Sequence, residues 1–388
     1  MAPRPPHSWL KAHDIRAVTL QLACIALVLG LIAWLIDNTL TNLATRSIAS
    51  GFDFLTRSAR FPISESVLPY APSDTFLWAF VAGLANTVVL AVVVAALSTG
   101  LGLVVALARR STNPLALGLS TSFVELMRNT PVVVQLLFWY ALVTLGLPNV
   151  HAALSPVAGV FLSDRGLYFP RVFLVGVTTP VLLAGLASAT CVAAVVLFVQ
   201  RRRSRGLHPR ACGIVAAAGA CAALVLAGIL GGAHLAITVP ELSRFNFVGG
   251  STLTPELVAL VLGLVLYSAA FVGEIIRGGI EAVGAGQWEA GRSLGLNDRH
   301  TLRFVIVPQA LRIIIPPMTS QYVNILKNTT LALVVGYPDL ASVTATTINQ
   351  TGQAIEGIVI LMSIFLILNL SASALMNWVN RRVALVQR

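Results

Sequence analysis

Long apolar runs separated by polar stretches form the main pattern of this 388-residue chain. A helix needs roughly 20 consecutive apolar residues to cross the hydrocarbon layer of a bilayer. Eight runs reach or approach this length. The pattern predicts an all-α polytopic membrane protein with about eight transmembrane helices, at residues 18–36, 78–107, 130–147, 172–199, 211–238, 257–276, 313–336 and 357–379.

Composition strengthens the membrane assignment. The chain is 56% hydrophobic and 11% charged, with a mean hydropathy of +0.84, whereas soluble domains carry charges at about 25% of positions. The first run follows a basic flank and is longer than the apolar core of a cleaved signal peptide, so we expect an uncleaved first span. The four cysteines lie in or beside apolar runs without C-x-x-C spacing, which is typical of small apolar packing residues.

The net charge of +11 raises the alternative of nucleic-acid binding. With the N-terminus inside, the inner loops hold 19 of the 26 Lys and Arg residues, the outer loops hold six, and Lys327 lies within a span. The positive-inside rule predicts this asymmetry for a protein with both termini in the cytoplasm. We therefore interpret the RRRSR run at 201–205 as a topological anchor and not as a phosphate-binding patch.

Two outer segments, residues 37–77 and 148–171, are too long for tight turns, and each contains three prolines. Two alternatives fit them equally well: a docking surface, or an irregular loop that covers the helix ends. The runs at 172–199 and 211–238 are rich in Ala and Gly, which favours close packing of helices.

Motifs of catalysis are absent from the sequence. Its two lysines, Lys11 and Lys327, do not belong to a G-x-x-x-x-G-K-[ST] phosphate loop. None of the six histidines occurs as H-E-x-x-H, and no G-x-S-x-G elbow is present. We therefore predict no catalytic, cofactor-binding or metal-binding residues, and transport by this chain would need an energy source elsewhere.

The stretch QWEAGRSLGLNDRH at 287–300 is a polar excursion between two apolar runs. Residues 289–294 are predicted to form a short helix, which Gly295 caps in the left-handed conformation. The small side chains of Ala290 and Gly291 would let this helix enter a groove of another protein. The alternative is an interfacial amphipathic loop without a partner.

A second helix is predicted at about 299–307, with Asn297 or Asp298 as its N-cap. Pro308 is expected to end it, because proline has no backbone N–H to donate to the preceding turn. The stretch would then form two short helices at a fixed angle.

The residues 287–311, QWEAGRSLGLNDRHTLRFVIVPQAL, resemble the EAA loop of permease subunits in bacterial ABC importers. That pattern is EAA, three residues, Gly, nine residues and then I-x-L-P. The spacing matches throughout, and the departures are small or apolar: a glycine for the second alanine, and valines for the isoleucine and leucine. The matched positions are Glu289, Ala290, Gly291, Gly295, Val305, Val307 and Pro308.

Further stretches resemble the polar amino-acid subgroup of these permeases. They are NTVVLAVVV at 86–94, FVELMRNTPVVVQLLFWY at 123–140, DRGLYFP at 164–170, GEIIRGGIEAVGAGQWEAG at 273–291 and PQALRIIIPPMTSQYVNILKNTTLALVVGYPDL at 308–340. The first span and the pair within 172–238 resemble the longer members described as general L-amino-acid permeases, which work beside a second, different permease.

The resemblance implies a type I ABC-importer permease core and a non-catalytic transport subunit of the bacterial inner membrane. In such importers the loop docks on a cytoplasmic ATPase dimer, and a periplasmic amino-acid-binding protein delivers substrate. Closure of the ATPase on ATP would push the helix at 289–295 and switch the path between inward-open and outward-open states. The implied organisation is an anchor span with a periplasmic segment at 1–77, core parts at 78–148 and 256–388, an inserted loop and helix pair at 149–255, and the EAA loop at 281–311.

Polar residues inside the predicted spans are candidates for the translocation path, because they are costly in a membrane. Lys327 lies about 21 Å along a helix begun at residue 313, and its amine can attract a substrate carboxylate. The alternative is a helix broken near Asn328, whose lysine snorkels or pairs with a carboxylate such as Glu356. The candidates are Asn86, Gln135, Glu274, Asn324, Lys327 and Asn328.

Three of these candidates also have structural interpretations. Asn86 and Gln135 can hydrogen-bond between helices, and this is the role that we favour for them. Glu274 and Arg277 are three residues apart and are predicted to form a pair on one helix face.

A second function class is an ion-coupled secondary amino-acid transporter that works without an ATPase. Such a protein is expected to show internal repeats, broken helices and acidic ion sites near mid-membrane. No such repeat is visible in the sequence, and carboxylates within the spans are scarce. A membrane-embedded enzyme is a third reading without a supporting motif.

Overall fold

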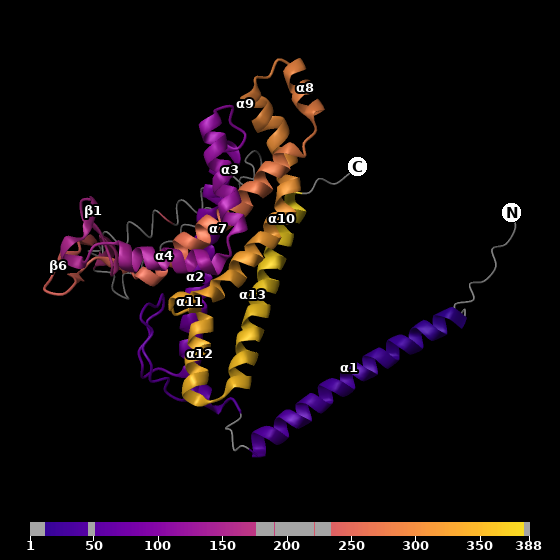
Figure 1. The fold of residues 1–388 in the computed structure, drawn as a ribbon, viewed down its shortest axis with the longest axis vertical. Helices are drawn as coiled ribbons and strands as arrows, with labels where there is room; N and C mark the ends of the chain where they lie inside the picture. Colours follow the sequence, from indigo (N-terminus) through magenta and orange to yellow (C-terminus); the bar gives the residue numbers. More distant parts are fainter. Residues whose placement is uncertain (1–11, 46–50, 176–189, 191–220, 222–233, 384–388) are drawn as a thin grey trace. The chain divides into compact units, whose positions relative to one another are not determined.

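The structure is a computed structural model that describes residues 12–45, 51–175, 190, 221 and 234–383 (Figure 1). The chain divides into two compact units, one of Met1–Arg128 with Val265–Arg388 and one of Asn129–Leu264. The first unit is helical. The second combines helices with short strands.

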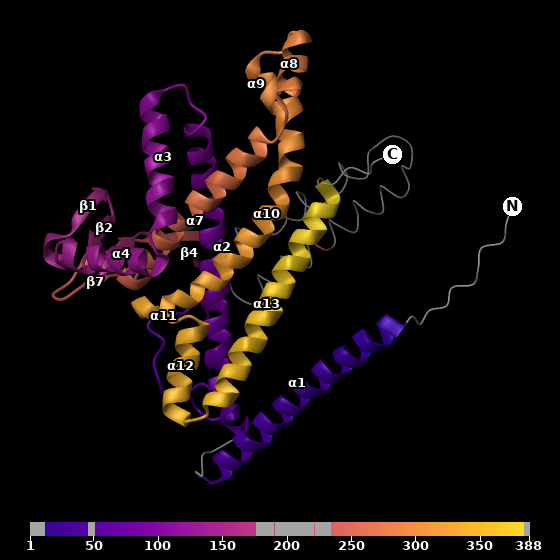
Figure 2. The same cartoon turned by 45° about the vertical axis from the view of Figure 1, so that its right-hand side comes forward.

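Helices α8 and α9 lie at one end of α7 and α10, and α12 lies beside the opposite end of α13 (Figures 1 and 2). The helix bounds are α1 (Ala12–Thr45), α2 (Phe76–Ala108), α3 (Pro114–Asn129), α7 (Pro255–Glu281), α8 (Ala285–Ser293), α9 (Asp298–Thr301), α10 (Val307–Asn328), α11 (Ala332–Val335), α12 (Leu340–Thr351) and α13 (Ala354–Val383). Helix α7 begins in the second unit and continues into the first.

Five helical segments among the described residues are long and apolar enough to cross a membrane. They are Ala17–Thr39, Phe76–Ala108, Pro255–Glu281, Asp298–Val335 and Ala354–Arg381, and they coincide with the predicted first, second, sixth, seventh and eighth spans. A sixth is obtained if α3 and α4 (Val132–Gly146) together make one span. The fold is therefore that of a polytopic helical membrane protein, and the described residues do not confirm the count of eight.

The predicted spans at 172–199 and 211–238 are wrong at their outer ends, because these ends are strands. Strand β4 (Arg171–Val175) pairs antiparallel with β5 (His234–Thr238), with Arg171 opposite Thr238 and Val175 opposite His234. The sequences RVFLV and HLAIT contain β-branched and aromatic residues, which favour strands. Most of the remaining Ala- and Gly-rich residues lie outside the described part of the chain.

A small sheet occupies part of the predicted outer segment 148–171. Its strand order is β1-β2-β3-β8, and Tyr168 and Phe247 pack in its core. This segment is therefore a folded sheet and not an irregular loop, and its use as a docking surface stays a prediction. The bounds are η2 (Val150–Ala152), β1 (Leu154–Val157), β2 (Val160–Ser163), β3 (Gly166–Phe169) and β8 (Ser251–Leu253), with a separate hairpin of β6 (Glu241–Leu242) and β7 (Phe247–Val248).

The other outer segment is irregular between residues 51 and 75 and packs against helix ends. Its only helical part among these residues is the 3₁₀ turn η1 (Asp53–Thr56). The rings of Phe54 and Phe61 are buried in a core with Phe80 of α2 and Leu340 of α12. The structure thus matches the second alternative, a loop that covers the helix ends.

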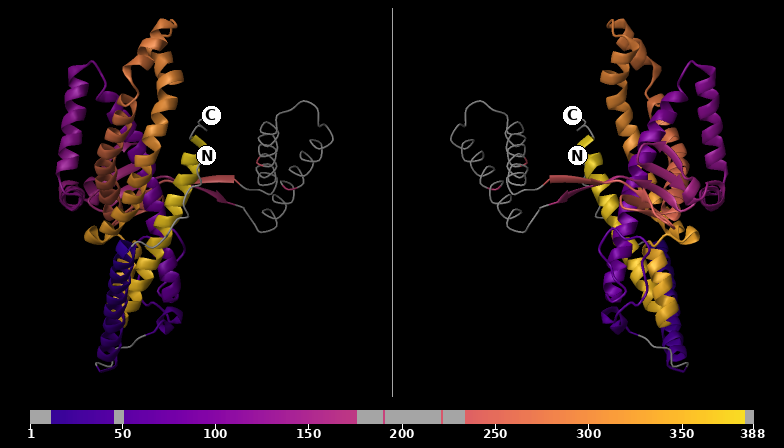
Figure 3. Two further views of the ribbon diagram at one scale, coloured as in Figure 1. Left: turned by 90° about the vertical axis from the view of Figure 1, so that its right-hand side faces the viewer. Right: turned by 90° about the vertical axis from the view of Figure 1, so that its left-hand side faces the viewer.

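Helices α2 and α7 cross at very close range where two glycines meet. A β-carbon on Gly102 would lie 2.6 Å from Val272 Cγ1 and 3.0 Å from the backbone nitrogen of Gly273. A β-carbon on Gly273 would lie 3.2 Å from the carbonyl oxygen of Gly102. Small residues allow such approach in a membrane, where helices gain little from hydrophobic association. Figure 3 shows the helices of this unit from two opposite sides.

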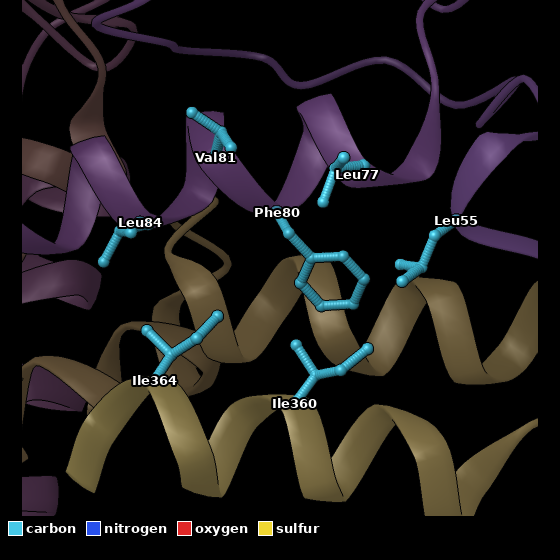
Figure 4. A pocket seen from close by; sticks show the side chains of 7 residues that line it. All are labelled: Leu55, Leu77, Phe80, Val81, Leu84, Ile360 and Ile364. Atoms are coloured by element: carbon cyan, nitrogen blue, oxygen red, sulfur yellow. The ribbon is translucent and has the colours of Figure 1, made fainter. Parts of the chain in front are cut away.

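An apolar groove of about 190 Å³ lies between α2 and α13 (Figure 4). The ring of Phe80 points toward Ile360 across it, and all the lining side chains are hydrocarbon. A charged ligand would find no hydrogen-bonding side chain in this lining. Its lining is Leu55, Leu77, Phe80, Val81, Leu84, Ile360 and Ile364.

Candidate functional site

Helix α8 is exposed on most of its surface and ends in a glycine cap. Gly295 has a φ of +74°, and its N–H donates to the Arg292 carbonyl at 2.9 Å. The N–H of Leu296 donates to the Gly291 carbonyl at 3.1 Å, which closes the cap. The predicted left-handed cap at Gly295 is therefore confirmed, although the helix begins at Ala285, four residues before the predicted start.

Asn297 is the N-cap of the following helix. Its Oδ1 accepts from the His300 N–H at 2.9 Å, which satisfies one of the free donors of the first turn. Of the two residues predicted for this role, the structure selects Asn297.

Pro308 does not end the second helix, so the prediction of two short helices is wrong. A π turn at Leu302–Ile306 follows α9, and α10 continues directly from it with Pro308 as its second residue. The Val307 N–H donates to the Leu302 carbonyl, five residues back. Such a widened turn accommodates a residue that lacks an N–H, and π turns often interrupt longer helices in this way. One short helix, α8, therefore precedes one long helical segment.

Gly291 faces inward against Thr301 within this chain, and its predicted role in coupling to an ATPase stays a prediction. It is the buried residue of α8, and a β-carbon there would lie 2.5 Å from Thr301 Cγ2. Glu289 and Ala290, the other two residues of the triplet, are exposed. The glycine thus lets α8 pack on α9, and the outward face of α8 carries the glutamate.

Replacing Gly291 with valine should loosen α8 from α9, because the new side chain overlaps Thr301. Forcing extra methyl groups into a packed contact costs about 1–3 kcal/mol. Ala290→Val places the same residue on the exposed face and is the matched control. Amide hydrogen exchange should rise in α8 for the Gly291 variant, and Thr301→Ala should partly reverse the change. Equal exchange in the two valine variants would contradict this packing role.

Trp288 joins α8 to the ends of neighbouring helices. Its indole packs against a buried cluster that includes Val283, Ile306 and Ala310. The guanidinium of Arg110, just after α2, lies 5.8 Å from the centroid of the indole, a distance typical of a cation–π contact. An open groove of about 500 Å³ beside this contact is lined by Arg110, Trp288, Arg292, Asp298, Arg299 and Leu302.

Glu274 is enclosed by three arginines. The predicted pair is confirmed, since Arg277 Nε donates to Glu274 Oε1 at 3.2 Å. Arg109 and Arg128 also form ion pairs with the same carboxylate. These ion pairs occupy the carboxylate within the chain, and a role of Glu274 in the translocation path stays a prediction.

The end of α10 carries three of the candidate path residues. Asn324 and Lys327 are exposed, and Asn328 is half-buried. Helix α10 ends at Asn328 in the 3₁₀ turn η4 (Thr329–Leu331), and the helical segment Asp298–Val335 continues through this turn, so the structure shows a change of helix type there and not the predicted break. The predicted pairing of Lys327 with Glu356 is wrong, because Glu356 Oε1 accepts instead from the Gly51 N–H, and Lys327 makes no ion pair among the described residues.

Asn86 is fully buried and bonds to loops, not to another helix. Its Nδ2 donates to the carbonyls of Glu65 and Pro338, each at 2.8 Å. Its Oδ1 accepts from the Val67 N–H at 2.9 Å. Gln135 Nε2 donates to the Thr130 carbonyl at 3.0 Å, close to the start of its own helix. Roles of Asn86 and Gln135 in the translocation path stay predictions.

Sequence reasoning missed a buried carboxyl group beside Asn86. Asp339 is fully buried and accepts from the Ser342 N–H at 2.8 Å as the N-cap of α12. Burial raises the pKa of Asp339 to about 6. The Leu340 N–H donates to Thr87 Oγ1, which fixes the same turn on α2. The signal was available, since Asp339 follows Pro338 and precedes a helix.

Sequence reasoning also missed a polar contact between α2 and α10. The hydroxyls of Thr99 and Tyr322 lie 3.0 Å apart. They line an open hollow of about 320 Å³ together with Ala95 and Ala96. Tyr322 is one of the polar side chains near Lys327 along α10.

A model of a protein family matches residues 98–385 of the chain, and its description is binding-protein-dependent transport system inner membrane component. The chain belongs to this family. Within it, the chain is related to amino-acid ABC transporter permeases over almost its whole length.

Three curated relatives illustrate this. YhdX of Escherichia coli K12, named as an amino-acid ABC transporter permease protein, is 45% identical over 381 residues, which are 96% of this chain and 95% of that protein. The general L-amino acid transport system permease protein AapQ of Rhizobium johnstonii is 37% identical over 376 residues, with 96% and 93% covered. The glutamate/glutamine/aspartate/asparagine transport system permease protein BztB of Rhodobacter capsulatus is 32% identical over 403 residues, with 96% and 95% covered.

Among solved structures, the chain resembles one of an amino acid ABC transporter with histidines. The TM-score is 0.48 at 21% identity, with 79% of this chain and 95% of that chain covered. It also resembles the inward-facing MetNI methionine ABC transporter, with a TM-score of 0.45 at 13% identity and with 80% and 98% covered.

Proposed function

We propose that this chain is the membrane-spanning subunit of an ATP-driven importer of polar L-amino acids and that α8 transmits the force of a separate ATPase. The observation that carries the proposal is the geometry of α8. Glu289 is exposed on a helix that Gly295 caps and Trp288 ties to the membrane helices. A short, rigid and outward-facing helix of this kind suits docking into a groove of another protein.

The proposed complex contains four kinds of protein chain. Besides this permease, it contains a cytoplasmic ATPase dimer, a second and different permease, and a periplasmic amino-acid-binding protein. The ATPase must be another chain because this sequence lacks a phosphate loop. The names of AapQ and BztB support general or polar L-amino acids as the substrate class.

The proposed orientation places α8 and both termini in the cytoplasm. The asymmetry of Lys and Arg between the two sets of loops supports it. In this orientation the loops with few Lys and Arg residues face the periplasm, where the binding protein would dock.

Lys327 and Asn324 are the proposed contacts for substrate in the membrane. Both are exposed on α10 in the isolated chain, and a lysine amine attracts the carboxylate that all amino acids carry. Glu274 is withdrawn from the path, since three arginines hold it. The ion-coupled alternative is not favoured, because both Glu274 and Glu356 already have partners within the chain.

Reconstitution tests the proposed function. Proteoliposomes that contain the permease pair and the ATPase should take up amino acids when ATP is inside and the binding protein is outside. Vesicles with this chain alone should not. Uptake by the chain alone, driven by an ion gradient, would support the secondary transporter instead and refute the proposal.

Replacing Gly295 with lysine in this system should separate ATP hydrolysis from uptake. An L-residue at a φ of +74° costs about 1–2 kcal/mol, which corresponds to a loss of uptake of roughly fivefold to thirtyfold. Gly284→Lys is the matched control, because Gly284 lies at the other end of α8 with a φ of −53° and open space around it. Gly295→Asn should retain more activity, since asparagine tolerates this conformation. Equal uptake by both lysine variants would contradict the role of the cap.

A further inference from the structure

The carboxylate of Glu274 joins three helices. Its Oε1 accepts from Arg109, which follows α2, and from Arg277 Nε of α7. Its Oε2 accepts from Arg277 Nη2 at 3.2 Å and lies 3.5 Å from Arg128 Nη1 of α3. We call these four residues, Glu274, Arg109, Arg128 and Arg277, the arginine latch.

Two of the four latch residues are largely shielded from solvent, while Arg277 is 27% exposed and Arg128 is 44% exposed. The side chains of Arg109 and Glu274 are only 17% and 21% exposed. The guanidinium of Arg128 lies 5.4 Å from the ring centroid of Phe271. Beneath it, Val105, Val124 and Ala270 form a buried cluster drawn from α2, α3 and α7. Partial burial makes the ion pairs less sensitive to screening than exposed pairs, so the contact holds the three helix ends in one arrangement.

Loss of the carboxylate would change the charge balance sharply. Arg109, Arg128 and Arg277 would then face one another, with Glu281 paired to Arg277 and Glu125 close enough to attract Arg109. Like charges at short range repel, most strongly where water is partly excluded. The three helix ends would separate or rearrange. Glu274 is therefore the component on which the assembly of the latch depends.

The same helix ends are connected to α8. Arg109 and Arg110 are adjacent in sequence after α2, and Arg110 lies over the indole of Trp288 in α8. Helix α7 carries Glu274 and ends only four residues before α8 begins. Displacement of α8 therefore acts on the latch by two routes, through the end of α2 and through α7.

We propose that Glu274 is a positioning residue that carries the movement of α8 into α2 and α3. This inference rests on the proposed function and deepens it. A pair that only stabilised α7 would need Arg277 alone, which lies on the same helix. The ion pairs with Arg109 and Arg128 instead join different helices. They connect α7, which is adjacent to α8 in sequence, with α2 and α3, which are not.

The test compares Glu274→Gln with Glu281→Gln in the reconstituted complex. Both changes remove one carboxylate from α7 that pairs with Arg277, but Glu281 is 48% exposed and its ion pair with Arg277 stays within one helix. We expect the Glu274 variant to hydrolyse ATP and to lose roughly tenfold in amino acid taken up per ATP, the size of a typical coupling between sites. The Glu281 variant should stay near wild type.

Two further variants keep the test decisive if Glu274→Gln assembles poorly. Arg128→Gln and Arg109→Gln should each lower uptake per ATP, and combining either with Glu274→Gln should add little, because both changes break one network. Glu274→Asp should retain part of the uptake per ATP that Glu274→Gln loses. A merely structural pair would change the melting temperature but leave uptake per ATP unchanged.

The outcomes distinguish a failure of the latch inference from a failure of the proposed transport function. If the wild-type complex shows no ATP-driven uptake, the proposed function fails. Suppose instead that the wild-type complex couples ATP hydrolysis to uptake normally. If Glu274→Gln then leaves the uptake per ATP unchanged, or if Glu281→Gln lowers the uptake per ATP equally, only the inference about the latch is overturned.

Discussion

Replacing Gly102 with leucine should prevent the protein from reaching its folded state in the membrane. The crossing of α2 and α7 leaves no room for a side chain, since a β-carbon would lie 2.6 Å from Val272 Cγ1 and 3.0 Å from the backbone of Gly273. The backbone cannot give way as a flexible side chain can. We expect a cost of about 3 kcal/mol, at the upper end of overpacking in a core, against a total stability of only about 5–15 kcal/mol.

Gly100→Leu is the matched control for this change. Gly100 lies two residues earlier on the same helix, is exposed, and has no atom within 4 Å of a β-carbon. Size-exclusion chromatography of detergent extracts should show a monodisperse peak for the Gly100 variant and little or none for the Gly102 variant. The Gly102→Ala variant should give a monodisperse peak of intermediate height. Adding Val272→Ala to this variant should partly restore the height of the peak. A normal peak for Gly102→Leu would show that the helices do not cross this closely.

Replacing Asn86 with leucine should release the segment 51–75 from α2. The change removes three hydrogen bonds, to the Glu65 carbonyl, the Val67 N–H and the Pro338 carbonyl. A net contribution of about 1 kcal/mol for each gives a loss of about 3 kcal/mol. The effect should be large because a single buried side chain fixes two loops that are far apart in sequence.

Limited proteolysis and thermal unfolding in detergent measure the loss. Cleavage within 51–75 should be faster for Asn86→Leu, and the melting temperature should fall. Asn377→Leu on α13 is the control, since that side chain is exposed. If the two variants melt and cleave alike, Asn86 does not hold these loops, and its alternative role in the translocation path gains support.

The sequence located most of the helices and the local features of the loop. Runs of about 20 apolar residues are a strong signal, because lipid imposes a length on every span. The cap at Gly295 and the N-cap at Asn297 depend on residues within one turn, so short patterns are enough to predict them. The triplet at 289–291 was placed on α8 for the same reason.

Features that depend on distant partners were not predictable. The ion pairs of Glu274 with Arg109 and Arg128 join residues about 150 positions apart, and nothing in the local pattern distinguishes these arginines from other inner-loop arginines. The strands β4 and β5 were mistaken for helix ends, since a short apolar run fits either structure until its partner is known. The contact of Gly291 with Thr301 was not predictable either, because Thr301 lies in a different helix.

The π turn before Pro308 has a geometric consequence for the direction in which Glu289 points. A π turn takes in one residue more than an α-helical turn, and each residue of an α-helix advances by about 100° around the axis. The direction of the glutamate therefore depends on this count of residues as well as on the contacts of Gly291 with Thr301 and of Trp288 with the buried cluster. In a homologue one residue shorter between 302 and 306, the part of the segment before the turn would be rotated by about 100° relative to α10, and these contacts would have to form with different residues.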